Sequence, residues 1–156
     1  MKFVFLILVI LSANSISAQN LLKERIWKIS DRKRSIFFDK GVFHSDLKAS
    51  NQMLQGVRNS YVSARGYERV VFDFASQNPP KVYGYISEDN KIYIDFFNTV
   101  LEKAIEPVSG VKYVKGINFY NIDSDGLSAE ITFKSKVSVD IFYLSNPGRI
   151  VIDIKK

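Results

Sequence analysis

Apolar and polar residues alternate in short runs from Leu54 to the end of the chain. This period of two is typical of β-strands that bury one face. Turn-forming residues separate the runs, among them Asn78-Pro79-Pro80 and Asn146-Pro147-Gly148. The pattern therefore predicts an all-β protein. One short stretch, residues 98–105 (NTVLEKAI), has the spacing of a helix and follows directly on a predicted strand.

Three of the predicted strands share the same outward pattern, in which a basic residue, an apolar or aromatic residue and an aspartate occupy alternate positions. These triplets are Arg69, Val71 and Asp73; Lys91, Tyr93 and Asp95; and Arg149, Val151 and Asp153. The residues between them are apolar, for example Ile92, Ile94 and Phe96. Because neighbouring side chains of a strand point to opposite faces, we expect the triplets to face solvent and the apolar residues to face a core.

The strand pattern occurs twice. Residues 85–96 align with residues 143–154 at an offset of 58, and five of the twelve positions are identical. The two copies comprise residues 54–98 and 114–156, and in each the predicted order of elements is strand, turn, strand, strand, turn, strand. One copy alone would leave its apolar face exposed, so the two should pack together. We expect a pseudo-twofold β-sandwich of two small sheets with one short helix between the copies.

The first residues have the organisation of a secretory signal peptide. Lys2 precedes the continuous apolar run Phe3 to Leu11, and small residues end at Ala18. The alternative is a membrane anchor, but the run is shorter than the roughly 20 residues that a spanning helix needs. With no cysteine after the run, a lipid anchor is not expected. We therefore predict a cleaved signal peptide (1–18), a periplasmic protein and no stable membrane anchor.

Residues 19–50 lack regular alternation and carry eight basic residues against four acidic ones. We interpret them as a basic N-terminal extension of the β domain, residues 51–156. Leu22, Ile26 and Ile29 have the spacing of a short helix face, and residues 36–38 could pair with 42–43 as strands. The cluster Arg32-Lys33-Arg34 could contact an anionic polymer, although a solvated turn is the simpler interpretation.

The amino-acid composition limits the classes of partner that the protein is expected to bind. Without the signal peptide the chain has 21 basic and 16 acidic residues, a modest excess that favours anionic partners such as cell-wall polymers. An exported protein is not expected to meet nucleic acid. The chain contains no cysteine, which excludes disulfides and thiolate metal sites. A domain of this size can be stable through hydrophobic burial alone.

The strands around these triplets resemble the AMIN domain, a family found at the front of exported N-acetylmuramoyl-L-alanine amidases and of pilus secretins. The motifs that carry the resemblance are residues 68–74 (ERVVFDF) and 144–154 (LSNPGRIVIDI). The resemblance spans roughly residues 54–156. The first copy departs from the motif, because residues 88–91 replace the proline and arginine of the turn. The resemblance implies two symmetric small β-sheets and a non-catalytic module that binds peptidoglycan.

Residues for catalysis or metal binding are sparse. His44 is the only histidine, too few for a zinc amidase or a Ser-His-Asp triad. Residues 121–126 begin like a calcium loop, but Thr132 stands where that loop needs glutamate, so a hairpin turn is expected instead. We therefore expect no enzymatic activity, no metal and no cofactor.

The triplets have two interpretations. Their basic residues could bind carboxylates of wall peptides while tyrosines such as Tyr83, Tyr85, Tyr93 and Tyr143 contact sugars. Alternatively, the charges pair across neighbouring strands and serve the fold. The resemblance favours binding for Arg69 and Arg149, which lie on its motif. The predicted ligand-binding residues are Arg69, Asp73, Lys91, Tyr93, Asp95, Tyr143, Arg149 and Asp153.

The sequence thus favours a non-catalytic envelope module that binds peptidoglycan or another anionic envelope polymer. The alternative is a protein-interaction module that docks onto a pilus, secretin or other envelope complex through its sheet edges or its basic extension.

Overall fold

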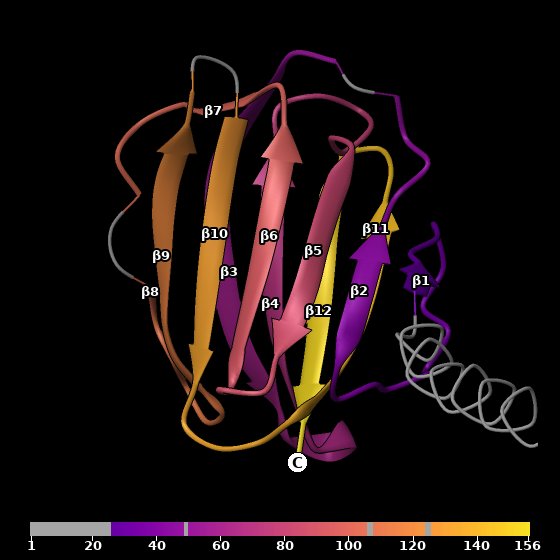
Figure 1. Ribbon diagram of the computed structural model, residues 1–156, viewed down its shortest axis with the longest axis vertical. Coiled ribbons are helices and arrows are strands. Elements are labelled where there is room, and N and C mark those ends of the chain that lie inside the picture. Colours follow the sequence, from indigo (N-terminus) through magenta and orange to yellow (C-terminus); the bar gives the residue numbers. More distant parts are fainter. Residues whose placement is uncertain (1–25, 49, 106–107, 124–125) are drawn as a thin grey trace, which may run out of the picture.

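The computed structural model describes residues 26–48, 50–105, 108–123 and 126–156. In these ranges the chain forms two β-sheets that pack face to face (Figure 1). The predicted all-β sandwich is confirmed. The predicted signal peptide, residues 1–18, lies outside the described residues. No described helix has the length and apolar composition needed to span a bilayer.

Sheet A has seven strands, in this spatial order: β1 (Ile26–Lys28), β2 (Gly41–His44), β5 (Val82–Ser87), β6 (Lys91–Phe97), β10 (Gly126–Phe133), β9 (Val114–Ile122) and β8 (Val108–Ser109). Sheet B has five, in this order: β11 (Ser138–Leu144), β12 (Arg149–Lys155), β4 (Tyr67–Phe74), β3 (Gln52–Val62) and β7 (Thr99–Leu101). The one described helical element is a 3-10 turn, Ser63–Arg65.

Each copy of the repeat divides its strands between the two sheets. The first copy places the β3–β4 hairpin in sheet B and the β5–β6 hairpin in sheet A. The second copy does the reverse, with β9–β10 in sheet A and β11–β12 in sheet B. The copies meet where β6 pairs with β10 and where β12 pairs with β4, both antiparallel. Equivalent strands therefore occupy equivalent places in opposite sheets.

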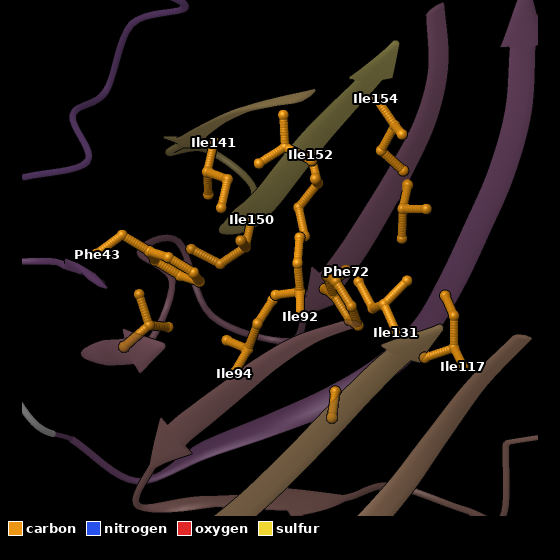
Figure 2. Packing of buried hydrophobic residues seen from close by; sticks show 14 of the residues in the cluster. Phe43, Phe72, Ile92, Ile94, Ile117, Ile131, Ile141, Ile150, Ile152 and Ile154 are labelled. Carbon is orange, nitrogen blue, oxygen red and sulfur yellow. The ribbon is translucent and has the colours of Figure 1, made fainter. Parts of the chain in front are cut away.

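The core lies between the sheets and consists mainly of β-branched and aromatic side chains (Figure 2). On β6, Ile92, Ile94 and Phe96 are buried while Lys91, Tyr93 and Asp95 are partly exposed, as the alternation predicts. Phe72 of β4 packs on Phe96 with ring centroids 5.2 Å apart. Burial of such side chains contributes about 1.5–3 kcal/mol each, and this supports a stable fold without disulfides.

The predicted helix at residues 98–105 is wrong. Asn98 adopts a left-handed conformation (φ 49°) and turns the chain sharply after β6. Residues Thr99–Leu101 then form β7, which runs parallel to β3 at the edge of sheet B. The buried Thr99 donates a hydrogen bond from its hydroxyl to the Phe97 carbonyl, 2.9 Å away. The β-branched pair Thr99-Val100 suits this edge pairing better than a helix.

The extension is built into both sheets. Its β2 pairs with β5, and β1 runs parallel to β2 at the edge of sheet A. Phe38 exchanges two backbone hydrogen bonds with Val139 of β11, both 2.9 Å long, and the Ser30 carbonyl accepts a bond from the Tyr143 amide. We call residues 29–38 the strap, because they cross from the edge of sheet A to the edge of sheet B.

Two predictions about the extension are wrong. Residues 36–38 do not pair with residues 42–43, because Phe38 pairs with Val139 and β2 pairs with β5 and β1. Ile26 belongs to strand β1 rather than to a helix face, and Leu22 lies outside the described residues. The open edges of β5 and β11 supply hydrogen-bonding partners that the local sequence pattern does not reveal.

Candidate functional site

The structure divides the predicted site residues between opposite sides of the sandwich. The outer face of sheet A carries Lys91, Tyr93 and Asp95, and the outer face of sheet B carries Arg69, Asp73, Arg149 and Asp153. Tyr143 lies on neither outer face. Its side chain packs partly buried against the main core, on the same side of β11 as Val139 and Ile141. The eight residues therefore do not form one site.

On sheet B, Arg69 and Asp153 pair with each other. They are direct partners in the β4–β12 register, and two of the three guanidinium nitrogens contact the carboxylate: Nε to Oδ1 at 2.6 Å and Nη2 to Oδ2 at 2.9 Å. Lys33 of the strap contacts the same carboxylate. Asp153 is 0% exposed, so the prediction that it faces solvent is wrong. Two cations from distant segments cover it.

A second buried carboxylate lies beside the first. Asp140 of β11 is the register partner of Asp153 and is 3% exposed. The Ser35 amide of the strap donates a hydrogen bond to Asp140 Oδ2 at 3.0 Å. Burial raises the pKa of Asp140, and the negative charge of Asp153 raises it further, while the Ser35 amide and the cations Lys33 and Arg69 act against this. This group of charges holds the strap on sheet B.

The remaining charges of this face are also engaged within the protein. Arg58 of β3 contacts Asp73 with two nitrogens, at 2.7 and 2.8 Å, so the partner of Asp73 is a residue outside the predicted triplets. Arg149 Nε donates a hydrogen bond to the Pro147 carbonyl at 3.4 Å. Between the charges, Val71, Phe142 and Val151 form a small buried cluster. Most charged side chains on the outer face of sheet B therefore have their hydrogen-bonding partners within the protein.

The outer face of sheet A is more open. Tyr83 and Tyr85 of β5 are 45% and 44% exposed. The Tyr85 ring stacks on the Tyr93 ring of the neighbouring strand, with centroids 5.0 Å apart and an interplanar angle of 20°. We call Tyr83, Tyr85 and Tyr93 the tyrosine face. The stacked pair and the exposed Tyr83 ring give this part of sheet A apolar aromatic surface together with hydroxyl groups.

Polar groups border the tyrosine face. Lys91 Nζ lies 3.1 Å from Glu130 Oε2 of β10, and both side chains are partly exposed. Asp95 is the register partner of Tyr83 on one side and of Ser128 on the other. Asp95 has no ion pair with any residue that the structure describes. The tyrosine face is thus bordered by an ion pair and a carboxylate that is available to a ligand.

The tyrosine face rests on closely packed backbone. Gly84 lies between Tyr83 and Tyr85 and points inward, where the ring of Phe43 and the carbonyl of Tyr93 leave no space for a Cβ. Phe43 is itself fully buried. Because β5 must approach Phe43 this closely, glycine is required at position 84. The close packing fixes the spacing of the two exposed tyrosines.

The structure also shows the surroundings of the residues that were considered for metal binding and catalysis. Within the described ranges, no group of three or more His, Cys, Asp or Glu side chains could hold a metal ion. His44 Nδ1 lies 3.4 Å from Asp46 at the surface. Asp125, part of the sequence that resembles a calcium loop, lies outside the described residues, but Asn121 and Ile122 pair with Leu127 and Gly126 in a hairpin.

Sequence reasoning missed Glu68, which is 0% exposed on β4. Its carboxylate accepts hydrogen bonds from the amides of Val111, Lys112, Tyr113 and Val114 and from the side chain of Asn59. Burial alone would raise its pKa, but these bonds together lower it below the usual value. Glu68 thereby fixes the start of β9 in sheet A onto sheet B. Its place beside Arg69 in the motif gave no signal of this role.

No known family model matches this chain, and a search of curated proteins finds no significant match.

Proposed function

We propose that this protein is a non-catalytic, exported module of the cell envelope that binds peptidoglycan through the outer face of sheet A. The observation that carries the proposal is the tyrosine face, where Tyr83, Tyr85 and Tyr93 lie together on an open sheet beside Asp95. The signal-like N-terminus and the AMIN resemblance support an envelope role.

The contrast between the two outer faces supports this choice of surface. On sheet B the charged side chains are partnered within the chain, and Asp153 is buried under Arg69 and Lys33. A ligand would have to break these pairs before it could bind there. On sheet A the tyrosine rings are exposed and need no rearrangement, so binding loses less free energy to reorganisation.

The chemistry of the face suits a wall polymer. Aromatic rings pack against the apolar faces of sugars, and the tyrosine hydroxyls and the Asp95 carboxylate can exchange hydrogen bonds with hydroxyl and amide groups. Open sheet faces suit long polymers, whereas small molecules usually require a concave pocket.

Co-sedimentation with purified sacculi tests the proposal. The chain from residue 19 onward should pellet with sacculi, and Tyr85→Ala combined with Tyr93→Ala should leave it in the supernatant. Arg149→Ala is the matched control on sheet B and should pellet as the parent does. Circular dichroism checks that every variant is folded. A folded parent protein that stays in the supernatant at saturating sacculi would disprove peptidoglycan binding.

A protein-interaction role has one observation of its own. Met53 of β3 and Val100 of β7 are register partners, and both are exposed, 38% and 47%. They form an apolar pair at the edge of sheet B, where a strand of another protein could add. A pull-down from envelope extract that survives complete digestion of peptidoglycan, and that Val100→Lys abolishes, would favour this function over wall binding.

A further inference from the structure

Two rows of side chains cross the outer face of sheet A at right angles to its strands. The first row follows the register from Tyr85 through Tyr93 and Glu130 to Asn118. The second follows it from Tyr83 through Asp95 and Ser128 to Tyr120, which is 52% exposed. Each row thus starts with tyrosine on β5, passes over polar side chains and ends on β9.

The rows are long enough for a polymer. They cross four strands, and three interstrand spacings amount to about 14 Å. In the second row a tyrosine lies at each end, with Asp95 and Ser128 between them. A ligand that lies along this row would therefore meet an aromatic ring, hydrogen-bonding groups and a second aromatic ring, which is a suitable order for a chain of linked sugars.

The charges of the rows distinguish between the two components of peptidoglycan. The rows contain two carboxylates, Asp95 and Glu130, and the lysine beside them, Lys91, is already paired with Glu130. A stem peptide carries several carboxylates, and these would be repelled by Asp95, the carboxylate of the rows that has no ion pair with a described residue. The sugars of the glycan strand present hydroxyl and acetamido groups, and a carboxylate accepts hydrogen bonds from both.

We propose that the two rows bind the glycan strand of peptidoglycan, laid across β5, β6, β10 and β9, and that the stem peptide is not needed for recognition. This inference rests on the proposed function and names the component of the polymer that is bound. The stacked pair Tyr85–Tyr93, at the β5 end of the first row, supplies its largest aromatic contact, because the two rings already lie in nearly the same orientation.

Isothermal titration calorimetry with two probes tests the inference. The probes are glycan strands freed of peptide by amidase digestion of sacculi, with the lactyl carboxylates that the digestion exposes converted to amides, and the stem peptides released by the same digestion. The parent protein should bind the glycan strands and not the peptides. Tyr93→Ala should weaken glycan binding by about fivefold or more, whereas Tyr93→Phe, which keeps the ring, should bind nearly as the parent does. Tyr61→Ala, on sheet B, is the matched control and should change nothing.

The outcomes separate this inference from the proposed function. Binding to intact sacculi without binding to peptide-free glycan, or binding to the free stem peptides, would overturn the glycan assignment and leave peptidoglycan binding intact. Equal glycan affinity of a folded Tyr93→Ala variant and the parent would overturn the assignment of the rows. If the folded parent does not bind intact sacculi, the proposed function fails and the glycan assignment fails with it.

Discussion

Arg69 on β4 and Asp153 on β12 lie directly opposite each other and form a two-pronged ion pair, although 84 positions separate them in the chain. Both residues belong to the strand motifs at residues 68–74 and 144–154, and each comes from a different copy of the repeat. In this protein the pair joins the two copies in sheet B. Arg69 therefore contributes to the fold through its ion pair with Asp153. A ligand that bound Arg69 would have to compete with Asp153.

Arg69→Ala should destabilise the protein by about 3 kcal/mol, because the buried Asp153 would keep only Lys33 as a cationic partner. Urea unfolding followed by circular dichroism measures the change. Arg149→Ala is the control from the same face and should change stability by less than about 0.5 kcal/mol. An Arg69→Ala variant as stable as the parent would show that the pair does not hold the copies together.

Asp140→Asn should stabilise the protein, in contrast to Arg69→Ala. Burial raises the pKa of Asp140, so the folded state binds its proton more tightly than the unfolded chain does. Stability that comes from this group is therefore lost as the pH rises from the unfolded to the folded pKa. At neutral pH, asparagine removes the buried charge and can still accept the Ser35 hydrogen bond. We expect a gain of up to about 1 kcal/mol in unfolding free energy, whereas a clear loss would contradict this account.

Glu68→Gln should destabilise the protein in a pH-dependent way. The pKa of Glu68 is below its ordinary value, so the ionised carboxylate stabilises the fold at neutral pH and this stability is lost as the pH falls through the folded pKa. Gln lacks the charge and should cost about 2 kcal/mol at pH 7. In thermal melts, the difference between the two proteins should shrink as the pH falls below about 4. A constant difference at all pH values would indicate a purely steric effect.

Gly84→Ala should disturb the tyrosine face from below. The added methyl group would meet the Phe43 ring and the Tyr93 carbonyl, and neither has room to move away. A cost of about 1–3 kcal/mol is expected from overpacking. Gly56→Ala, where nothing lies within 4 Å of the added carbon, is the control. In chemical denaturation Gly84→Ala should unfold at lower urea than both the parent and the control.

The alternation of β6 was sufficient to predict its buried and exposed faces, because Ile92 and Tyr93 obey the local period of two. The same reasoning failed for Asp153. Its neighbours along β12 place it on the outer face correctly, but its burial depends on Lys33, 120 positions away. A strand pattern tells which side a residue faces and does not tell what covers that side.

The sequence predicted only the part of the candidate site that lies on a single strand. Lys91, Tyr93 and Asp95 lie on one strand, so the sequence alone groups them. The neighbours Tyr83 and Glu130 join them only through the pairing of β6 with β5 and β10. Arg58 and Glu68 gave no signal, because their partners are fixed by strand register and by backbone amides of a distant segment. The helical spacing of residues 98–105 gave a wrong prediction, because Thr99 pairs with the edge of β3 instead.

The exchange of hairpins between the sheets has a consequence for the origin of the fold. Each copy supplies one hairpin to each sheet, and the copies touch through β6–β10 and β4–β12. A gene that encoded a single copy would yield half of each sheet, with an apolar face left bare. Two such chains could complete the sandwich only as an intertwined homodimer. Duplication and fusion of that gene would convert the dimer into a monomer, and equivalent hairpins could then diverge: β5–β6 of sheet A carries exposed tyrosines, whereas its counterpart β11–β12 in sheet B carries the buried carboxylates Asp140 and Asp153.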